Sequence, residues 1–137
     1  MRAVEARQGV IDILARALEV EYQIIIHSPR VAKMMPDKQL ELKVELLGQD
    51  SIRHADIVAA TITKLGSIPP FPSFTPLPEP LNLKDFFKKQ LVLEKLALDL
   101  HSQAAESVGD DLAPSLRQLA EQERWHIRIV EEILSRI

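Results

Sequence analysis

The chain has 137 residues, a formal net charge of −3, 46% hydrophobic residues and no cysteine. This length suits one domain with its own core, and the lack of cysteine excludes disulfides, thiol redox chemistry and thiolate-bound metals. The weak acidity provides no basic surface for nucleic acid, and no run of about 18 apolar residues could span a bilayer. The first residues contain no apolar secretory segment, so we expect a soluble, cytoplasmic protein that binds neither nucleic acid nor membrane.

The first predicted helix spans about residues 4–34. Apolar residues recur along it at spacings of three and four, and Glu21 lies on the same stripe. A second stripe of Val20, Ile24 and Val31 lies beside it, and a single four-helix arrangement would leave that stripe partly exposed. We therefore expect a homo-oligomer, at least a homodimer, that buries this face of the helix. The alternative is that these residues belong to an ordinary core.

The second predicted helix spans about residues 37–65. Pro29 is expected to kink the first helix or to end it nearby, and Asp37 is well placed to cap the second. The apolar stripe of the second helix includes Ser51 and His54. Because only a short turn separates the two helices, they are predicted to form an antiparallel hairpin.

The segment of about residues 66–82 is rich in proline and separates the second predicted helix from the third. Proline favours an extended path, and about 16 such residues reach roughly 50 Å at about 3.1 Å each. This reach is enough to return along the second helix, so the third helix can start at the same end as the second. The apolar residues of the segment predict that it packs on the bundle, and a disordered linker or a proline-rich ligand is the alternative. These residues are Phe71, Phe74, Leu77 and Leu81.

The third and fourth predicted helices span about residues 83–108 and 111–136. Glu94 lies among the leucines of the third helix, and Glu123 and His126 lie on the apolar stripe of the fourth. Side chains three positions apart share one face of a helix, so Glu123 and His126 can reach the same point. A buried carboxylate without a partner costs several kcal/mol, so a metal or another group must neutralise it if this face is buried. The alternative is that Glu123 lies at the surface and His126 in the core.

The polar residues that interrupt the apolar stripes fall at about the same height, near the middle of the predicted bundle. At about 1.5 Å per residue, their distances from the hairpin turns agree to within about one helical turn. Carboxylates that meet in a core repel one another, whereas a divalent metal would neutralise them and hold the imidazoles neutral. The converging residues are Glu21, His54, Glu94, Glu123 and His126. Of the other histidines, His27 is assigned to the surface or a turn, and His101 to the core or to a position that supports a ligand.

These residues resemble the pattern of the ferritin-like di-iron carboxylate superfamily, and of its bacterioferritin and rubrerythrin branches in particular. In that family two helices each supply one glutamate, and the other two each supply Glu-x-x-His. Glu21 and Glu94 match the two single glutamates. His54 matches the histidine of the second helix, and Glu123 with His126 matches the complete pair of the fourth. The resemblance implies an all-α, ferritin-like four-helix bundle of two antiparallel hairpins joined by a long proline-rich crossover.

The second helix departs from the family pattern, because Ser51 occupies the position of its glutamate and cannot supply a bridging carboxylate. Asp50 is adjacent but lies about 100° around the helix, so it can replace the glutamate only if the helix rotates or bulges locally. Three possibilities follow. The site can hold two metal ions bridged by one protein carboxylate, it can hold one metal ion, or it can have lost the ability to bind metal. Ile52 stands where bacterioferritin has its haem-ligating methionine, so we predict no haem. In the first helix, Glu19 is an alternative ligand to Glu21.

The resemblance implies two candidate functions of different classes. In the first, the chain binds one or two iron ions and oxidises ferrous iron with dioxygen or peroxide, although manganese or zinc would suit the same ligands. In the second, the chain is a non-catalytic ferritin-like bundle with a degenerate or single-metal site, acting as a binding or interaction protein. Metal content separates the two functions.

Overall fold

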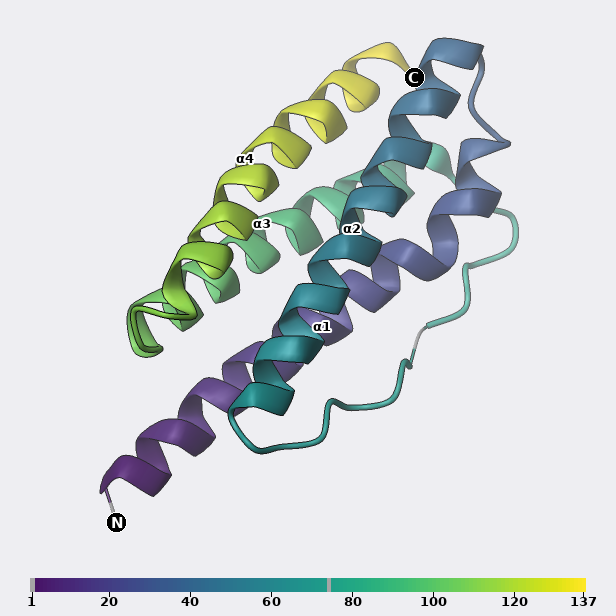
Figure 1. The fold of residues 1–137 in the computed structure, drawn as a ribbon. Coiled ribbons are helices and arrows are strands. Elements are labelled where there is room, and N and C mark those ends of the chain that lie inside the picture. The colour runs from purple at the N-terminus through teal and green to yellow at the C-terminus, as the bar shows by residue number, and fades with distance from the viewer. Residues whose placement is uncertain (1, 74) are drawn as a thin grey trace.

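The computed structural model contains four long helices packed into one bundle (Figure 1). It describes residues 2–73 and 75–137, with side chains from residue 6 onward. The helices are α1 (Arg2–Ala32), α2 (Lys38–Lys64), α3 (Leu83–Ser107) and α4 (Ala113–Arg136). Each begins and ends within two residues of its predicted bounds, and the all-α fold class is confirmed. Within the described residues, none of these helices is both long and apolar enough to cross a membrane.

Two antiparallel hairpins, α1 with α2 and α3 with α4, are joined by the crossover of residues 65–82 (Figure 1). The crossover runs along the outside of the bundle, so α3 starts at the same end as α2. Asp37 caps α2 by accepting a hydrogen bond from the N–H of Leu40 at 2.8 Å, as predicted. Asn82 caps α3 in the same way, accepting from the N–H of Asp85 at 3.0 Å. These caps fix where α2 and α3 begin, and hence the height of the side chains that each helix carries.

The hairpin of α1 and α2 is closely packed near Pro29, and α1 continues through this proline for three more residues. Proline has no N–H group, so the carbonyl of Ile25 loses its helical donor. The hydroxyl of Ser28 donates to that carbonyl at 3.3 Å. Ser28 also faces Gly48 of α2, where an added Cβ atom would lie 2.1 Å from Ser28 Oγ. Gly48 therefore permits α1 and α2 to approach each other at this point.

The bundle interior contains two large apolar clusters separated by a polar layer, and a smaller third cluster between α1 and α3. One cluster contains Val10, Leu14, Leu18, Ala55, Val58, Ile62, Ala104, Ala105, Leu116 and Leu119. The other contains Val31, Ala32, Leu40, Val44, Leu47, Phe87, Ile129, Val130 and Ile133. On every helix, the residues between these two sets include buried polar side chains. The polar layer therefore lies near mid-bundle, where the interrupted apolar stripes predicted it.

The second apolar stripe of α1 is buried inside the bundle, so the reason given for a homodimer is wrong. Ile24 is only 2% exposed and packs in one cluster with Ala97 and Leu100 of α3. A sequence that is apolar on several faces does not reveal which face a neighbouring helix covers. A homo-oligomer formed through α1 stays a prediction, and the apolar side chains available for it on α1 and α2 include Ile26 and Ile52, which are about half exposed.

The crossover packs on the bundle through only part of its apolar residues. Leu77 and Leu81 are half-buried against the cluster that contains Phe87, as expected. Phe71 is 92% exposed, so the prediction that it packs is wrong. The fourth predicted contact, Phe74, lies outside the described residues. The apolar contacts that the crossover makes with the bundle therefore lie at its end near α3.

Candidate metal centre

Six buried side chains from all four helices converge in the polar layer, and each is 0% exposed. They form two groups whose candidate ligand atoms lie within 4.8 Å of one another. One group contains Glu21, His54, His101 and Glu123, and the other contains Glu94, Glu123 and His126. Glu123 belongs to both groups. The arrangement therefore has the form of two adjacent sites bridged by a single carboxylate.

His54 of α2 has polar partners at both nitrogen atoms of its imidazole ring. Its Nδ1 atom lies 2.6 Å from Glu123 Oε1 and 3.0 Å from Glu21 Oε2. Its Nε2 atom lies 2.6 Å from the amide oxygen of Gln122, to which it can only donate. An outer partner of this kind holds the tautomer and orientation of a metal-binding histidine. His54 is therefore oriented with Nδ1 toward the centre.

His126 of α4 is oriented in the same way by a different outer partner. Its Nε2 atom lies 2.9 Å from Asp50 Oδ2, and Asp50 is in turn paired with Arg53 at 3.1 Å. Its Nδ1 atom lies 3.6 Å from Glu94 Oε2 and 3.6 Å from Glu123 Oε2. The rings of His54 and His126 stack at 5.2 Å. Both imidazoles thus present Nδ1 to the shared glutamate and bind a carboxylate or amide with Nε2.

The carboxylates of the cluster have pKa values that differ strongly from one another. Burial, and then the negative charge of Glu123, raise the pKa of Glu21 to about 7. Burial also raises the pKa of Glu94 well above its usual value. Burial acts in the same direction on Glu123, but its contacts with His126 and His54 outweigh this and hold its pKa well below the usual range. Glu123 is therefore the permanently ionised group at the centre of the cluster.

The imidazoles respond to the same carboxylates. Burial acts to lower the pKa of His54, but the contacts with Glu123 and Glu21 raise it to about 10. His126 behaves similarly, and its contacts with Glu123 and Glu94 raise its pKa to about 11 against the effect of burial. Burial lowers the pKa of His101 to about 4. At neutral pH two of the three imidazoles are thus protonated in the metal-free cluster, and His101 is neutral.

His101 is the site residue whose role the sequence did not reveal. The ring is fully buried and packs edge-on against His54 at 6.0 Å, and within the described part of the chain neither ring nitrogen has a hydrogen-bond partner. The sequence predicts that His101 lies in the core or supports a ligand, because core histidines are common. The available signal was its spacing from Glu94, since residues seven positions apart return to the same face of a helix.

The structure settles where the doubtful residues lie. Glu19 is exposed and Glu21 is buried in the cluster, so α1 has the register that presents Glu21. Ser51 is fully buried, and its hydroxyl has no hydrogen-bond partner among the described residues. Helix α2 is unbroken at Asp50, which binds the outer nitrogen of His126 instead of replacing the missing glutamate. Asp50 therefore orients His126 and belongs to neither candidate group.

Several buried polar atoms of the cluster have no hydrogen bond, as is expected of the ligand atoms of a metal site. Buried polar atoms normally have a hydrogen-bond partner, and each one without a partner costs about 1–3 kcal/mol. Across the described chain, the buried atoms without a hydrogen bond include both carboxylate oxygens of Glu21 and Glu94, both nitrogens of His101, Glu123 Oε2 and His126 Nδ1. Some of these atoms face an ionic partner, since Glu21 Oε2 lies 3.0 Å from His54 Nδ1 and both Glu94 Oε2 and Glu123 Oε2 lie 3.6 Å from His126 Nδ1. Oxygen and imidazole nitrogen are suitable ligands for iron, manganese and zinc. The residues present therefore fit a bound metal.

Two solved structures resemble the chain over nearly its whole length. One is a ferritin-like, diiron-carboxylate protein from Bacillus anthracis strain Ames, with a TM-score of 0.81 and 18% sequence identity, covering 94% of this chain and 97% of that one. The other is the bacterioferritin of Desulfovibrio desulfuricans, with a TM-score of 0.78 and 20% identity, covering 96% of this chain and 81% of that one. This chain has the ferritin-like fold. No protein-family model and no curated protein matches the sequence.

In this ferritin-like bundle, the four helices contribute unequally to the buried cluster. α1 supplies one carboxylate, α2 one histidine, α3 a carboxylate and a histidine, and α4 a carboxylate and a histidine. Their side chains meet because the crossover lets α2 and α3 start at the same end of the bundle. A buried Glu/His cluster in a ferritin-like fold fits a metal-binding protein.

Proposed function

We propose that this protein binds iron in its mid-bundle cluster and oxidises ferrous iron with dioxygen or peroxide. The observation that carries the proposal is the set of buried carboxylate and imidazole atoms without hydrogen bonds, which converge from four helices. Iron held there would supply one-electron redox chemistry, with ferrous iron giving an electron to the oxidant. The two similar solved structures support this choice of metal, since both are described as diiron proteins.

The charge of the cluster suits an ion whose positive charge increases during the reaction. Glu21, Glu94 and Glu123 can supply up to three negative charges in a buried environment, where the attraction between opposite charges is strong. The neutral imidazole of His101 adds a ligand without adding charge. The carboxylates would therefore stabilise ferric iron more than ferrous iron, which favours the oxidation.

The two ligand groups are proposed to bind with unequal affinity. The group around His54 and His101 offers two carboxylates and two imidazoles, four ligands in all. The group around His126 offers two carboxylates and one imidazole, because Ser51 supplies no carboxylate from α2. We therefore expect one tight and one weak equivalent of iron per chain, with Glu123 shared between them.

The test is metal analysis after anaerobic reconstitution with ferrous iron, followed by admission of oxygen. Wild-type protein should retain between one and two iron ions per chain and convert them to the ferric state faster than iron in buffer. The double variant Glu123→Ala with His126→Ala should retain none. A matched control is Glu121→Ala with Arg124→Ala, which removes an exposed ion pair with the same spacing on α4. Equal iron content in the two double variants would contradict the proposal.

The second candidate is a non-catalytic bundle with a degenerate or single-metal site that acts as a binding or interaction protein, and one observation favours it. The protonated imidazoles of His54 and His126 already face Glu123, so the cluster can balance much of its charge with internal ion pairs. Protein purified without chelator separates the two functions. The absence of iron, manganese and zinc, combined with failure to take up ferrous iron, would support the non-catalytic bundle with a degenerate site. One metal ion per chain without oxidation of ferrous iron would support its single-metal form.

A further inference from the structure

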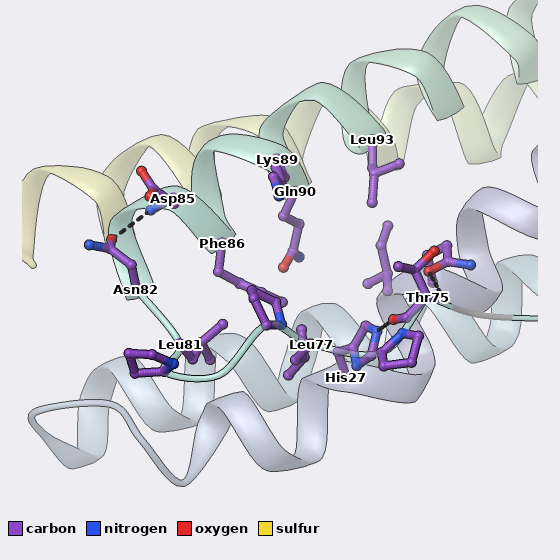
Figure 2. A pocket seen from close by; sticks show the side chains of 15 residues that line it. His27, Thr75, Leu77, Leu81, Asn82, Asp85, Phe86, Lys89, Gln90 and Leu93 are labelled. Carbon is purple, nitrogen blue, oxygen red and sulfur yellow. Dashed lines mark hydrogen bonds between the residues drawn. The ribbon is translucent and has the colours of Figure 1, made fainter.

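Different parts of the chain cover the bundle on its different sides. The crossover lies along α1 and α3, where His27 Nε2 donates to the carbonyl of Thr75 at 2.7 Å (Figure 2). Figure 1 shows α4 on the opposite side of α2 from the crossover. The contacts that enclose the cluster between α2 and α4 therefore come from side chains of these two helices.

Arg53 of α2 contacts two of these side chains with one nitrogen of its guanidinium group. Its Nη2 atom lies 3.1 Å from Asp50 Oδ1, one helical turn earlier on α2. The same atom donates to the amide oxygen of Gln122 on α4, also at 3.1 Å. A guanidinium group is always charged and has only donors, so both oxygens accept from it. Arg53 therefore joins a carboxylate of α2 to an amide of α4.

The two side chains that Arg53 contacts are the outer partners of the two imidazoles. Asp50 accepts from His126 Nε2 at 2.9 Å through its other oxygen, Oδ2. Gln122 accepts from His54 Nε2 at 2.6 Å through the same oxygen that faces Arg53. An amide oxygen can accept two hydrogen bonds, so both donors hold the oxygen end of this amide toward α2. An unbroken path of polar contacts thus runs from one imidazole to the other through Arg53.

The exposure of Arg53 separates its role from that of the bundle core. Its side chain is 53% exposed, whereas the rings of His54 and His126 are fully buried. An exposed ion pair by itself adds little stability, so we expect the bundle to fold without Arg53. The contacts that orient a metal-binding histidine do affect how well it binds metal. The effect of Arg53 is therefore expected at the imidazoles.

We propose that Arg53 is a positioning residue that holds the imidazoles of His54 and His126 together, so that both present Nδ1 to Glu123. The proposal rests on the proposed metal-binding role of these histidines. It gives Arg53 a wider role than Asp50, which orients His126 alone. Loss of Arg53 should weaken both ligand groups at once, by about two- to tenfold each. This is less than the cost of about 10–100-fold for a direct outer partner, because Arg53 acts one contact further out.

The experiment follows the two outer ring N–H groups by NMR in metal-free protein that contains isotope-labelled histidine. In the wild type, the Nε2 protons of His54 and His126 should exchange slowly with solvent, because both are hydrogen-bonded and both rings are buried. Arg53→Met keeps an unbranched side chain but removes the donor. Both protons should then exchange about two- to tenfold faster, the effect expected of one weakened hydrogen bond. Competition titration with zinc should show the loss of affinity in both ligand groups.

Two further variants separate the contact from general effects. Arg124→Met is the matched control, because Arg124 is 52% exposed and pairs with Glu121 one turn earlier on α4. It should leave both exchange rates and both zinc affinities unchanged. Arg53→Lys should recover most of the slow exchange, since the single nitrogen of its ammonium group has three donors for Asp50 and Gln122.

Three results would overturn the proposal: wild-type exchange of both ring protons in Arg53→Met; acceleration at His126 alone, which would limit Arg53 to its contact with Asp50; or equal acceleration in Arg124→Met. If Arg53→Met does not fold, the wild type decides, because rapid exchange of either ring proton would contradict the proposal. Failure of the wild type to bind zinc would contradict the proposed metal binding. The role of Arg53 in orienting the rings is still decided in that case, since ring-proton exchange is measured without metal.

Discussion

The two ligand groups that share Glu123 differ in what surrounds them. The group with His54 and His101 is complete, with two imidazoles and two carboxylates and no exposed member. The group with Glu94 and His126 has one imidazole, and Ser51 leaves it without a carboxylate from α2. Both groups offer two carboxylates, so the difference between them is the second imidazole, which His101 of α3 provides. The predictions below perturb one group at a time.

The largest effect on a single group is expected from His101→Leu, which removes a ligand of the complete group. We expect the affinity for the tightly bound iron to fall by at least about 100-fold. Loss of a partner that only orients a ligand already lowers metal affinity by up to about that factor. Because the unpaired nitrogens of His101 are removed, the metal-free protein should become more stable by about 1–3 kcal/mol. Iron titration and urea unfolding measure the two effects. Loss of stability with unchanged iron affinity would assign His101 a purely structural role.

The metal affinity of both ligand groups should depend on pH. The pKa values of His54 and His126, about 10 and 11, mean that both imidazoles are protonated at neutral pH in the metal-free protein. A metal needs the neutral form, so binding releases protons, and affinity should rise about tenfold per pH unit for each proton released. The rise should continue up to about pH 10 and then level off as the imidazoles deprotonate. Competition titrations with zinc at about pH 6 and about pH 8 test this. Equal affinity at both would show that these imidazoles are not ligands.

The incomplete group should respond to Asp50→Asn, because Asp50 orients His126 through its outer nitrogen. We expect the weak equivalent to lose about 10–100-fold in affinity while the tight equivalent is unchanged. Asp56→Asn is the matched control, since Asp56 is exposed on the same helix. An equal loss in both variants would indicate a general effect of charge instead of an effect on His126.

The smallest expected effect is an increase in the iron affinity of the incomplete group. Ser51→Glu introduces a carboxylate on α2 at a fully buried position, one helical turn before His54. The weak equivalent should bind about tenfold more tightly, comparable to the effect of one well-placed supporting partner. Metal titration followed by oxidation in air measures both the affinity and the stoichiometry. An unchanged second equivalent would count against placing residue 51 beside the second metal.

The sequence predicted the four helices and brought together five of the six cluster residues because helical spacing of three and four determines which side chains share a face. It placed Glu21, His54, Glu94, Glu123 and His126 at one level, where the structure has them. That they bind metal stays a prediction. The fold class followed from the length of the crossover, since only a long connection lets α2 and α3 start at the same end.

The sequence could not predict the burial of Ile24, the contact of Asp50 or the place of His101. These depend on which helix covers which face, and no local sequence pattern contains this information. Ile24 looked exposed because its stripe lies beside the core stripe, but α3 covers it. Asp50 points about 100° around the helix from the face that carries Ser51. Its contact with His126 therefore depends on how closely α4 approaches α2. His101 has the spacing of a core residue, and its unpaired nitrogens become informative only when the neighbouring groups are known.

The central claim is that Glu123 bridges a tight and a weak iron site, and anomalous diffraction at the iron absorption edge tests it most directly. Crystals of the protein reconstituted anaerobically with ferrous iron should show a strong peak among Glu21, His54, His101 and Glu123. A weaker peak should lie between Glu123, Glu94 and His126. Anomalous density only at surface carboxylates, with the contacts of Glu123 to His54 and His126 intact, would contradict the account.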